Sequence, residues 1–286
     1  MDGRIKVIHK KNGGLVSARK AGLEKSTGEY VCFVDGDDFV LADMLEKFEE
    51  ILVSEKYDVV CTEYAKYRKD GQVVPVKQNI EVGAYDKSRL TDIIYPKMLS
   101  SSKFYSFGVM PNVFTKCIKK KILCEIYAGI PDEISLGEDV AVTYPALLKA
   151  NNVFFSDYCG YMYRENLQSM THTYDRNLYD KVRNLILYLR AFKHESKWED
   201  NGQIDEYSFF LLVLAKNNEF KYSKFEKYHL KRKKMQRYIS DPLFSEALKN
   251  IKLHEMRYKF LRFCFRKNFL IPVYFYESVL NASRGR

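Results

Sequence analysis

The sequence predicts an α/β domain followed by a helical extension, and three observations support this. Up to about residue 170, short apolar runs typical of strands alternate with segments of helical periodicity, which is the pattern of helices packed on a sheet. From residue 171 onward helical periodicity dominates. The 286 residues, 46% hydrophobic and 29% charged, are enough for one large domain and an appendage. We therefore expect an α/β domain over residues 1–170 and a helical extension over residues 171–286.

The early part of the chain contains the most distinctive elements. Leu15 to Lys25 has helical spacing, with Leu15, Ala18, Ala21 and Gly22 on one face. Tyr30 to Val34 reads YVCFV, a continuous apolar run that is typical of a strand covered on both faces. The other elements expected here are a strand over residues 5–8, an amphipathic helix over residues 42–54 and a strand over residues 57–64.

The later elements follow from turn signals and helix starts. Asp70-Gly71 is typical of a hairpin turn. Gly137-Glu138-Asp139 opens a helix that continues to Ala150. The remaining expectations are a helix over residues 86–99, an extended segment over 108–118, a short basic helix over 119–124, a strand over 153–156 and an aromatic extended segment over 160–164.

Charge and cysteine content restrict the partners and the compartment. The formal net charge of +10 favours anionic partners, which are nucleotide diphosphates, nucleic acid or an anionic membrane surface. None of the six cysteines forms a C-x-x-C pair, so we expect reduced thiols in a cytoplasmic protein. The first 12 residues are polar and basic, unlike a signal peptide, and no run of 18 apolar residues occurs.

Four residues, Asp35-Gly36-Asp37-Asp38, follow the apolar run at residues 30–34. In open α/β sheets, ligands bind beyond the carboxyl ends of strands. Neighbouring carboxylates repel one another, and a divalent cation between them removes that cost. Mg²⁺ and Mn²⁺ commonly take one or two carboxylates together with substrate phosphates. The pattern indicates a metal and diphosphate site, and the alternative is a solvated loop in which Asp37 or Asp38 caps the next helix.

Three segments resemble family 2 glycosyltransferases, which have the GT-A fold. They are NGGLVSARKAGLEKSTGEYVCFVDGDDFV, LGEDVAVTYPALLKA and YMYRENLQSMT, in the family's order over about residues 4 to 172. The resemblance implies that Asp35 and Asp37 bind the metal, Mn²⁺ or Mg²⁺, and the donor diphosphate, with Asp38 in support. It implies that Arg19 faces the nucleotide or its phosphates, although a solvated arginine is the alternative.

The resemblance also implies the catalytic groups. Asp139 would be the base that takes the proton from the acceptor hydroxyl, and Glu138 would orient the site or contact the acceptor. The alternative is that both are ordinary acids in the first turn of a helix, where they are favoured. Arg164 would stabilise the departing diphosphate with Ser169 nearby, and the alternative is a loop arginine with a turn serine.

The family normally begins with strands that hold the nucleobase and ribose. The resemblance implies that on the order of 60–70 residues, about two strands and a helix, are absent at the N-terminus. We therefore expect an N-terminally truncated GT-A-like mixed sheet, with weakened donor binding. His9 and His172 lack metal-ligand spacing and are interpreted as structural or surface residues.

The helical extension ends in a basic and aromatic stretch over residues 256–280. Interleaved Lys, Arg, Phe and Tyr suit an interfacial segment on an anionic leaflet. The alternative is an amphipathic helix that packs on the catalytic domain. The membrane interpretation predicts peripheral contact at the inner face of the cell membrane.

The resulting hypothesis is an inverting glycosyltransferase that moves a sugar from a nucleotide-diphosphate sugar, most simply a UDP-sugar, to a glycan or lipid-linked acceptor. The product would be a surface polysaccharide such as capsule or a cell-wall glycan. An inactive remnant or an interaction protein is the alternative. A nucleotidyltransferase would need a Gly-rich triphosphate loop, which the sequence lacks. Nucleic acid is not expected as a partner, because the basic residues are spread along the chain.

Overall fold

The computed structural model describes residues 2–101, 104, 106–165, 173–223 and 226–276. The chain forms two compact units. Unit 1 comprises Met1–Tyr95 and Val109–Glu165, and unit 2 comprises Pro96–Gly108 and Asn166–Arg286. The grouping of residues 96–108 with the helical unit was not expected from the sequence, and the predicted division after residue 170 stays a prediction.

Unit 1 contains a five-stranded sheet in the order β1 (Tyr30–Cys32), β7 (Lys116–Lys119), β3 (Val59–Cys61), β8 (Asn152–Phe155) and β6 (Gly83–Asp86). The β3–β8 pair is parallel and the other three pairs are antiparallel. Strand β1 therefore lies at one edge of this sheet.

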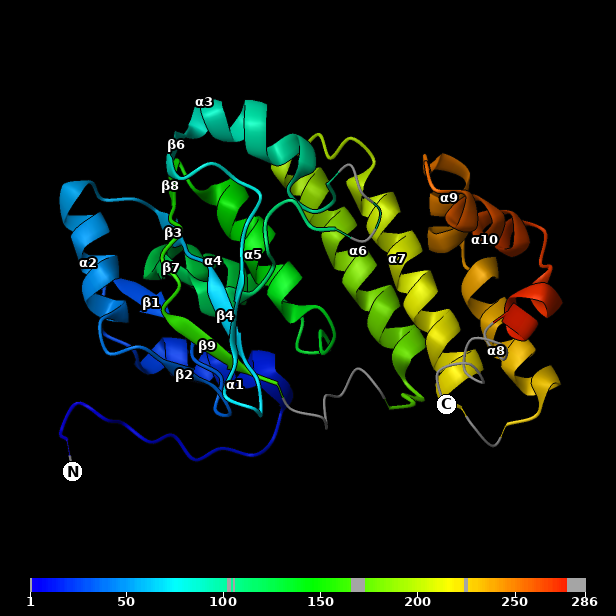
Figure 1. The fold of residues 1–286 in the computed structure, drawn as a ribbon, viewed down its shortest axis with the longest axis horizontal. Helices are drawn as coiled ribbons and strands as arrows, with labels where there is room; N and C mark the ends of the chain where they lie inside the picture. The colour runs from blue at the N-terminus through cyan, green and yellow to red at the C-terminus, as the bar shows by residue number, and fades with distance from the viewer. Residues whose placement is uncertain (1, 102–103, 105, 166–172, 224–225, 277–286) are drawn as a thin grey trace. The chain divides into compact units, whose positions relative to one another are not determined.

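A second sheet of unit 1 has the order β2 (Phe39–Val40), β9 (Tyr161–Arg164), β4 (Tyr64–Tyr67) and β5 (Val73–Val76). Strands β4 and β9 are parallel, whereas β2–β9 and β4–β5 are antiparallel. The β4–β5 hairpin contains Gly71 at φ +82°, so the turn predicted at Asp70-Gly71 forms. The two mixed sheets confirm the predicted α/β fold (Figure 1).

The helices of unit 1 surround these sheets. They are α1 (Gly14–Lys25), α2 (Met44–Ser54), α3 (Lys87–Arg89), α4 (Lys120–Gly129) and α5 (Glu138–Lys149), with a π-helix at Leu90–Ile94 and a 3₁₀ turn at Val113–Thr115. A further 3₁₀ turn, Tyr95–Lys97, begins at the last residue of the segment Met1–Tyr95 and continues into unit 2. The core lies on the central strands, where Val60 and Ile118 have no exposed surface. Phe114 stacks on Tyr161 with ring centroids 4.2 Å apart.

Three local predictions for unit 1 were wrong. Residues 5–8 form no strand, and Ile5 and Val7 are 67% and 72% exposed, because no described strand pairs with them. The buried face of α1 carries Val16, Arg19 and Leu23, so the face predicted around Leu15 is not the one that packs inward. Strand β1 is half-buried and not fully buried, because it lies at the edge of the sheet and pairs with β7 alone among the described strands.

Unit 2 is helical in its described residues. Its elements are α6 (Leu178–Ser196), α7 (Gln203–Asn217), a π-helix at Asn218–Tyr222, α8 (Tyr228–Ser240), α9 (Pro242–Asn250) and α10 (Met256–Arg266). Helices α6 and α7 pack side by side (Figure 1), and Leu185, Phe209 and Phe244 are fully buried. None of the described helices is both long and apolar enough to cross a bilayer.

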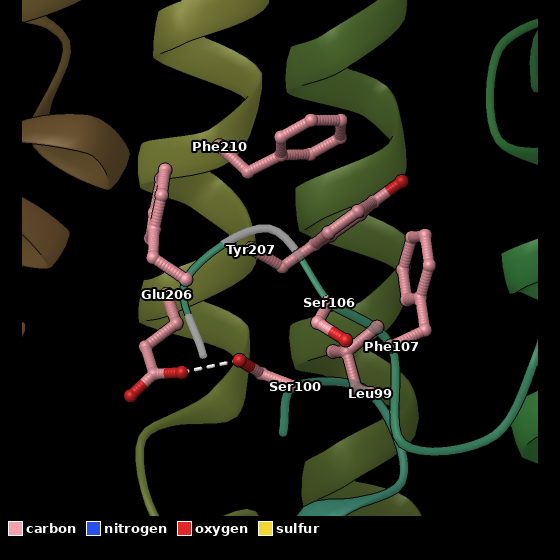
Figure 2. Close-up of a pocket in the computed structure, with 8 residues that line it drawn as sticks. Leu99, Ser100, Ser106, Phe107, Glu206, Tyr207 and Phe210 are labelled. Carbon is pink, nitrogen blue, oxygen red and sulfur yellow. Dashed lines mark hydrogen bonds between the residues drawn. The ribbon is translucent and has the colours of Figure 1, made fainter. Parts of the chain in front are cut away.

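Unit 2 also contains a small cavity of about 20 Å³ (Figure 2). The loop residues Leu99, Ser106 and Phe107 line it together with Tyr207 and Phe210 of α7. Its polar end is the hydrogen bond that Ser100 donates to Glu206. Burial raises the pKa of Glu206, against the lowering effect of that bond. A cavity of this volume has room for about one water molecule, so it is too small for a sugar.

Candidate functional site

Three segments of unit 1 that are distant in sequence meet at one ionic cluster. The Arg19 guanidinium donates from Nη1 to Asp139 Oδ1 at 2.7 Å, and its Nη2 lies 3.5 Å from Asp35 Oδ1. Arg19 comes from α1, Asp35 follows β1, and Asp139 lies in the first turn of α5. The structure therefore brings together three of the residues that the sequence indicated.

Helical spacing explains why Arg19 points inward. It lies three residues after Val16 and four before Leu23, and all three share the buried face of α1. Its side chain is only 6% exposed, and the guanidinium lies 5.4 Å from the centroid of the Phe33 ring. Burial alone would disfavour the charged guanidinium, but the carboxylates of Asp139 and Asp35 outweigh it and raise the pKa of Arg19. Arg19 thus remains a cation that joins two carboxylates.

The acidic loop carries more negative charge than Arg19 neutralises. Burial raises the pKa of Asp35, Arg19 opposes that shift, and the neighbouring charges of Asp139 and Asp38 raise it further. Asp37 is exposed to solvent beside them. A concentration of carboxylates that repel one another attracts a cation.

Asp38 has a bracing role that the sequence did not indicate. Its Oδ2 accepts a hydrogen bond from the Tyr161 hydroxyl at 2.7 Å, and its Oδ1 accepts one from the backbone N–H of Arg164 at 2.8 Å. The Tyr161 oxygen in turn accepts the backbone N–H of Asp35 at 3.1 Å. Burial, together with the bond to Asp38, raises the pKa of Tyr161, so its hydroxyl stays a donor. These bonds fix the acidic loop on β9.

The residues present fit a hard divalent cation only in part. Among the described residues no three carboxylate, imidazole or thiol groups converge as a metal cage. Two carboxylates, Asp35 and Asp37, remain on the loop, since both oxygens of Asp38 accept bonds within the protein. Mg²⁺ and Mn²⁺ commonly bind one or two carboxylates and complete their shell with substrate phosphates and water. The donor set therefore suits a metal that arrives with a diphosphate.

The start of α5 places two acids at one helix N-terminus. Gly137 caps the helix with φ +67°, a left-handed conformation that favours glycine. Glu138 and Asp139 then occupy the first turn, where the helix dipole stabilises negative charge. Burial and the adjacent Asp139 raise the pKa of Glu138. One acid of the pair is thus held by Arg19, and the other is less acidic than an ordinary glutamate.

Other predicted residues are placed as follows. Arg164 is exposed at the end of β9, and its guanidinium lies 5.1 Å from the centroid of the Phe39 ring. His9 is exposed, while Ser169 and His172 lie outside the described residues. Tyr127 of α4 was not singled out from the sequence. Burial raises the pKa of its hydroxyl to about 12, and the neighbouring Arg19 guanidinium opposes that shift.

Comparisons with known proteins relate this chain to glycosyltransferases. Residues 1–114 match the family model described as Glycosyl transferase family 2. The Bacillus subtilis protein named uncharacterized glycosyltransferase EpsJ is 29% identical over 170 residues, which are 59% of this chain and 47% of that protein. The B. subtilis protein named putative glycosyltransferase EpsH is 26% identical over 257 residues, 87% of this chain and 70% of that protein. The chain thus spans about half the length of the first of these relatives.

Solved structures show the same fold. Residues 1–349 of S. aureus TarS match with a TM-score of 0.62 at 19% identity, over 95% of this chain and 72% of that one. The complex of TarS 1–349 with UDP-GlcNAc matches with a TM-score of 0.58 at 17% identity, over 96% of this chain and 74% of that one. The predicted GT-A-like fold is confirmed by this likeness.

Proposed function

We propose that this chain is a family 2 glycosyltransferase, the family whose model matches residues 1–114, and that it transfers a sugar from a nucleotide-diphosphate sugar to a glycan or lipid-linked acceptor. The observation that carries the proposal is the cluster in which Arg19 joins Asp35 of the acidic loop to Asp139 of α5. It sets the proposed diphosphate site beside the proposed base, as a group transfer requires.

In the proposed reaction, the donor diphosphate lies at Asp35 and Asp37, next to the exposed Arg164. A divalent ion bound there would neutralise charge on the departing diphosphate. Arg164 would add a fixed positive charge, with its side chain lying against Phe39. UDP is the nucleotide we propose, because TarS was crystallised with UDP and with UDP-GlcNAc.

Asp139 is the proposed base. Its carboxylate, 22% exposed, would accept the proton of the acceptor hydroxyl as that oxygen attacks the anomeric carbon, with inversion. Arg19 would hold this carboxylate in place through the 2.7 Å hydrogen bond. The role of Arg19 toward phosphates, expected from the sequence, stays a prediction, because its guanidinium contacts Asp139 and Asp35 here.

Binding of the donor is the first test. Titration calorimetry with UDP and Mn²⁺ should give a measurable Kd for the wild type, and Asp37→Asn should weaken it about tenfold or more, equivalent to about 1.4 kcal/mol. Asp37 is exposed, so its substitution leaves the core untouched. Asp132→Asn removes a surface carboxylate that pairs with Lys20 and serves as the matched control. Equal affinities for the two variants would refute the metal and diphosphate assignment.

Turnover is the second test, with UDP release from UDP-GlcNAc as the readout. Asp139→Asn should retain UDP binding but lose about 10²–10⁴-fold in rate, the usual contribution of a general base. If the wild type binds UDP and releases none from any donor tried, the inactive-remnant or interaction-protein alternative is supported instead.

The proposed location is the cytoplasmic side of a membrane, in surface polysaccharide synthesis. Helix α10 buries Tyr258 and Phe265 yet leaves Phe260 and Phe263 each 53% exposed among basic residues. Such a face suits an anionic leaflet. Pelleting with anionic vesicles should recover the wild type, with less recovery at high salt and for the variant Phe260→Ser/Phe263→Ser. Equal recovery on neutral vesicles would refute the electrostatic part.

A further inference from the structure

Two cysteines face each other across neighbouring strands. Cys32 of β1 and Cys117 of β7 are direct partners in the antiparallel register. Directly opposite residues in such a pair have Cα atoms about 4.5–5.5 Å apart, and disulfides need about 4.4–6.8 Å. The backbone therefore already has the spacing that a disulfide requires. Both cysteines are free thiols in this structure.

The two side chains also lie on the same side of the sheet. Cys117 is 3% exposed and belongs to a buried apolar cluster, and Cys32 packs against that cluster. The contact with Cys32, together with burial, raises the pKa of the Cys117 thiol. The thiols therefore approach each other closely, and a bond between them requires no rearrangement of the strands.

A groove of about 490 Å³ gives access to both thiols. It lies between β1 and α2, both of which are drawn in blue in Figure 1. Its walls include Tyr30, Leu45, Phe48 and Leu52 together with Cys32 and Cys117. Small-molecule sites commonly have volumes of about 300–1,000 Å³, so a low-molecular-weight disulfide is of a size to reach the pair.

We propose that Cys32 and Cys117 are a redox-active pair that forms a cross-strand disulfide by exchange with a small-molecule disulfide such as oxidised glutathione. The inference does not depend on the proposed function. The half-buried Cys32 reacts first, because it is the more accessible of the two. Its thiol loses a proton to solvent, its sulfur attacks one sulfur of oxidised glutathione, and one glutathione leaves as a thiolate that takes up a proton.

The second step closes the bond. The Cys117 sulfur attacks the Cys32 sulfur in the mixed disulfide, its proton goes to solvent, and the second glutathione leaves and is protonated. In sum, the two cysteines lose two hydrogens and are oxidised, while oxidised glutathione is reduced to two glutathione molecules. The bond ties β1, an edge strand, covalently to β7, only three residues before Asp35 of the acidic loop.

The test is an equilibration of the full chain in buffers of reduced and oxidised glutathione, followed by acid quenching, thiol counting and intact mass. Oxidised wild type should lose two hydrogens in mass and retain four of its six thiols. Cys32→Ser and Cys117→Ser should each retain all their remaining thiols or stop at a glutathione adduct. Cys124→Ser is the matched control, because Cys124 is exposed on α4, and it should still form the disulfide.

Peptide mapping of oxidised wild type gives a readout that requires no variant to fold. A peptide linked through Cys32 and Cys117 supports the proposal. Retention of all six thiols, a stable glutathione adduct on wild-type Cys32, or a disulfide between any other pair would overturn it.

Discussion

Replacing Arg19 by Met tests whether the ionic cluster holds unit 1 together. The variant keeps a side chain of similar length but leaves Asp139 and Asp35 without their shared cation. Removing one partner of a buried ion pair costs about 3–5 kcal/mol. The carboxylates of Asp139 and Asp35 are 22% and 32% exposed, so water partly screens their charge. We therefore expect the free energy of unfolding to fall by about 2–3 kcal/mol.

A loss of about 2 kcal/mol corresponds to a decrease of roughly 4–8 °C in the Tm of a domain of about 150–250 residues. Scanning calorimetry or circular dichroism is the suitable assay, because the single tryptophan, Trp198, lies in unit 2 and does not report on unit 1.

The double variant Arg19→Met/Asp139→Asn separates charge from packing. When Asp139 is already neutral, Arg19→Met should lower the free energy of unfolding by less than it does in the wild type. The coupling energy between the two substitutions should exceed about 1 kcal/mol. An Arg19→Met protein as stable as the wild type, or a coupling below about 0.5 kcal/mol, would refute the reasoning.

Three further predictions concern single groups of the site. Glu138→Gln should raise the free energy of unfolding at pH 7, because burial raises the pKa of Glu138 and makes its charge costly in the folded state. The gain should disappear as the pH falls below the ordinary glutamate pKa of 4.5, where the folded and unfolded states are both protonated. Urea unfolding at a series of pH values measures this dependence. Tyr161→Phe should lower the free energy of unfolding by about 1–3 kcal/mol, because Asp38 and the backbone N–H of Asp35 each lose a hydrogen-bond partner. Chemical denaturation measures the loss, with Tyr163→Phe as the control. Gly137→Ala should lower the free energy of unfolding by about 1–2 kcal/mol, because Gly137 has a left-handed φ of +67°. The control Gly129→Ala lies in a helix with no atom within 4 Å of an added Cβ, so thermal denaturation should show it to be neutral or stabilising.

The fold was predictable because its signals are local. The alternation of apolar runs and helical segments led to α/β, and the pair Asp70-Gly71 marked a turn that needs a positive φ. Strand β1 shows where such signals fail. Its apolar run indicated burial on both faces, but its position at the sheet edge is set by pairing with β7, some 85 residues later in the chain. No local pattern encodes the position of a strand within a sheet.

The site was predictable as a set of residues but not as a set of contacts. Arg19 lies at helical spacing from Val16 and Leu23, but a charged side chain at that position could equally be solvated, and its partners Asp35 and Asp139 are not evident from the helix itself. Asp38 was expected to support Asp35 and Asp37 at the diphosphate site, and the structure shows that both of its oxygens accept bonds from β9. Tyr161 was visible in the sequence as part of an aromatic strand, but its partner lies 123 residues away.

That separation has a consequence for how the protein folds. The bonds from Arg19 to Asp139 and from Tyr161 to Asp38 close chain loops of 120 and 123 residues. Contacts of such long range form only after loop-closure entropy has been overcome by other structure. We therefore expect the ionic cluster to be among the last features to form during refolding and among the first to open locally in the native state. Recovery of UDP binding should lag behind recovery of secondary structure after dilution from denaturant.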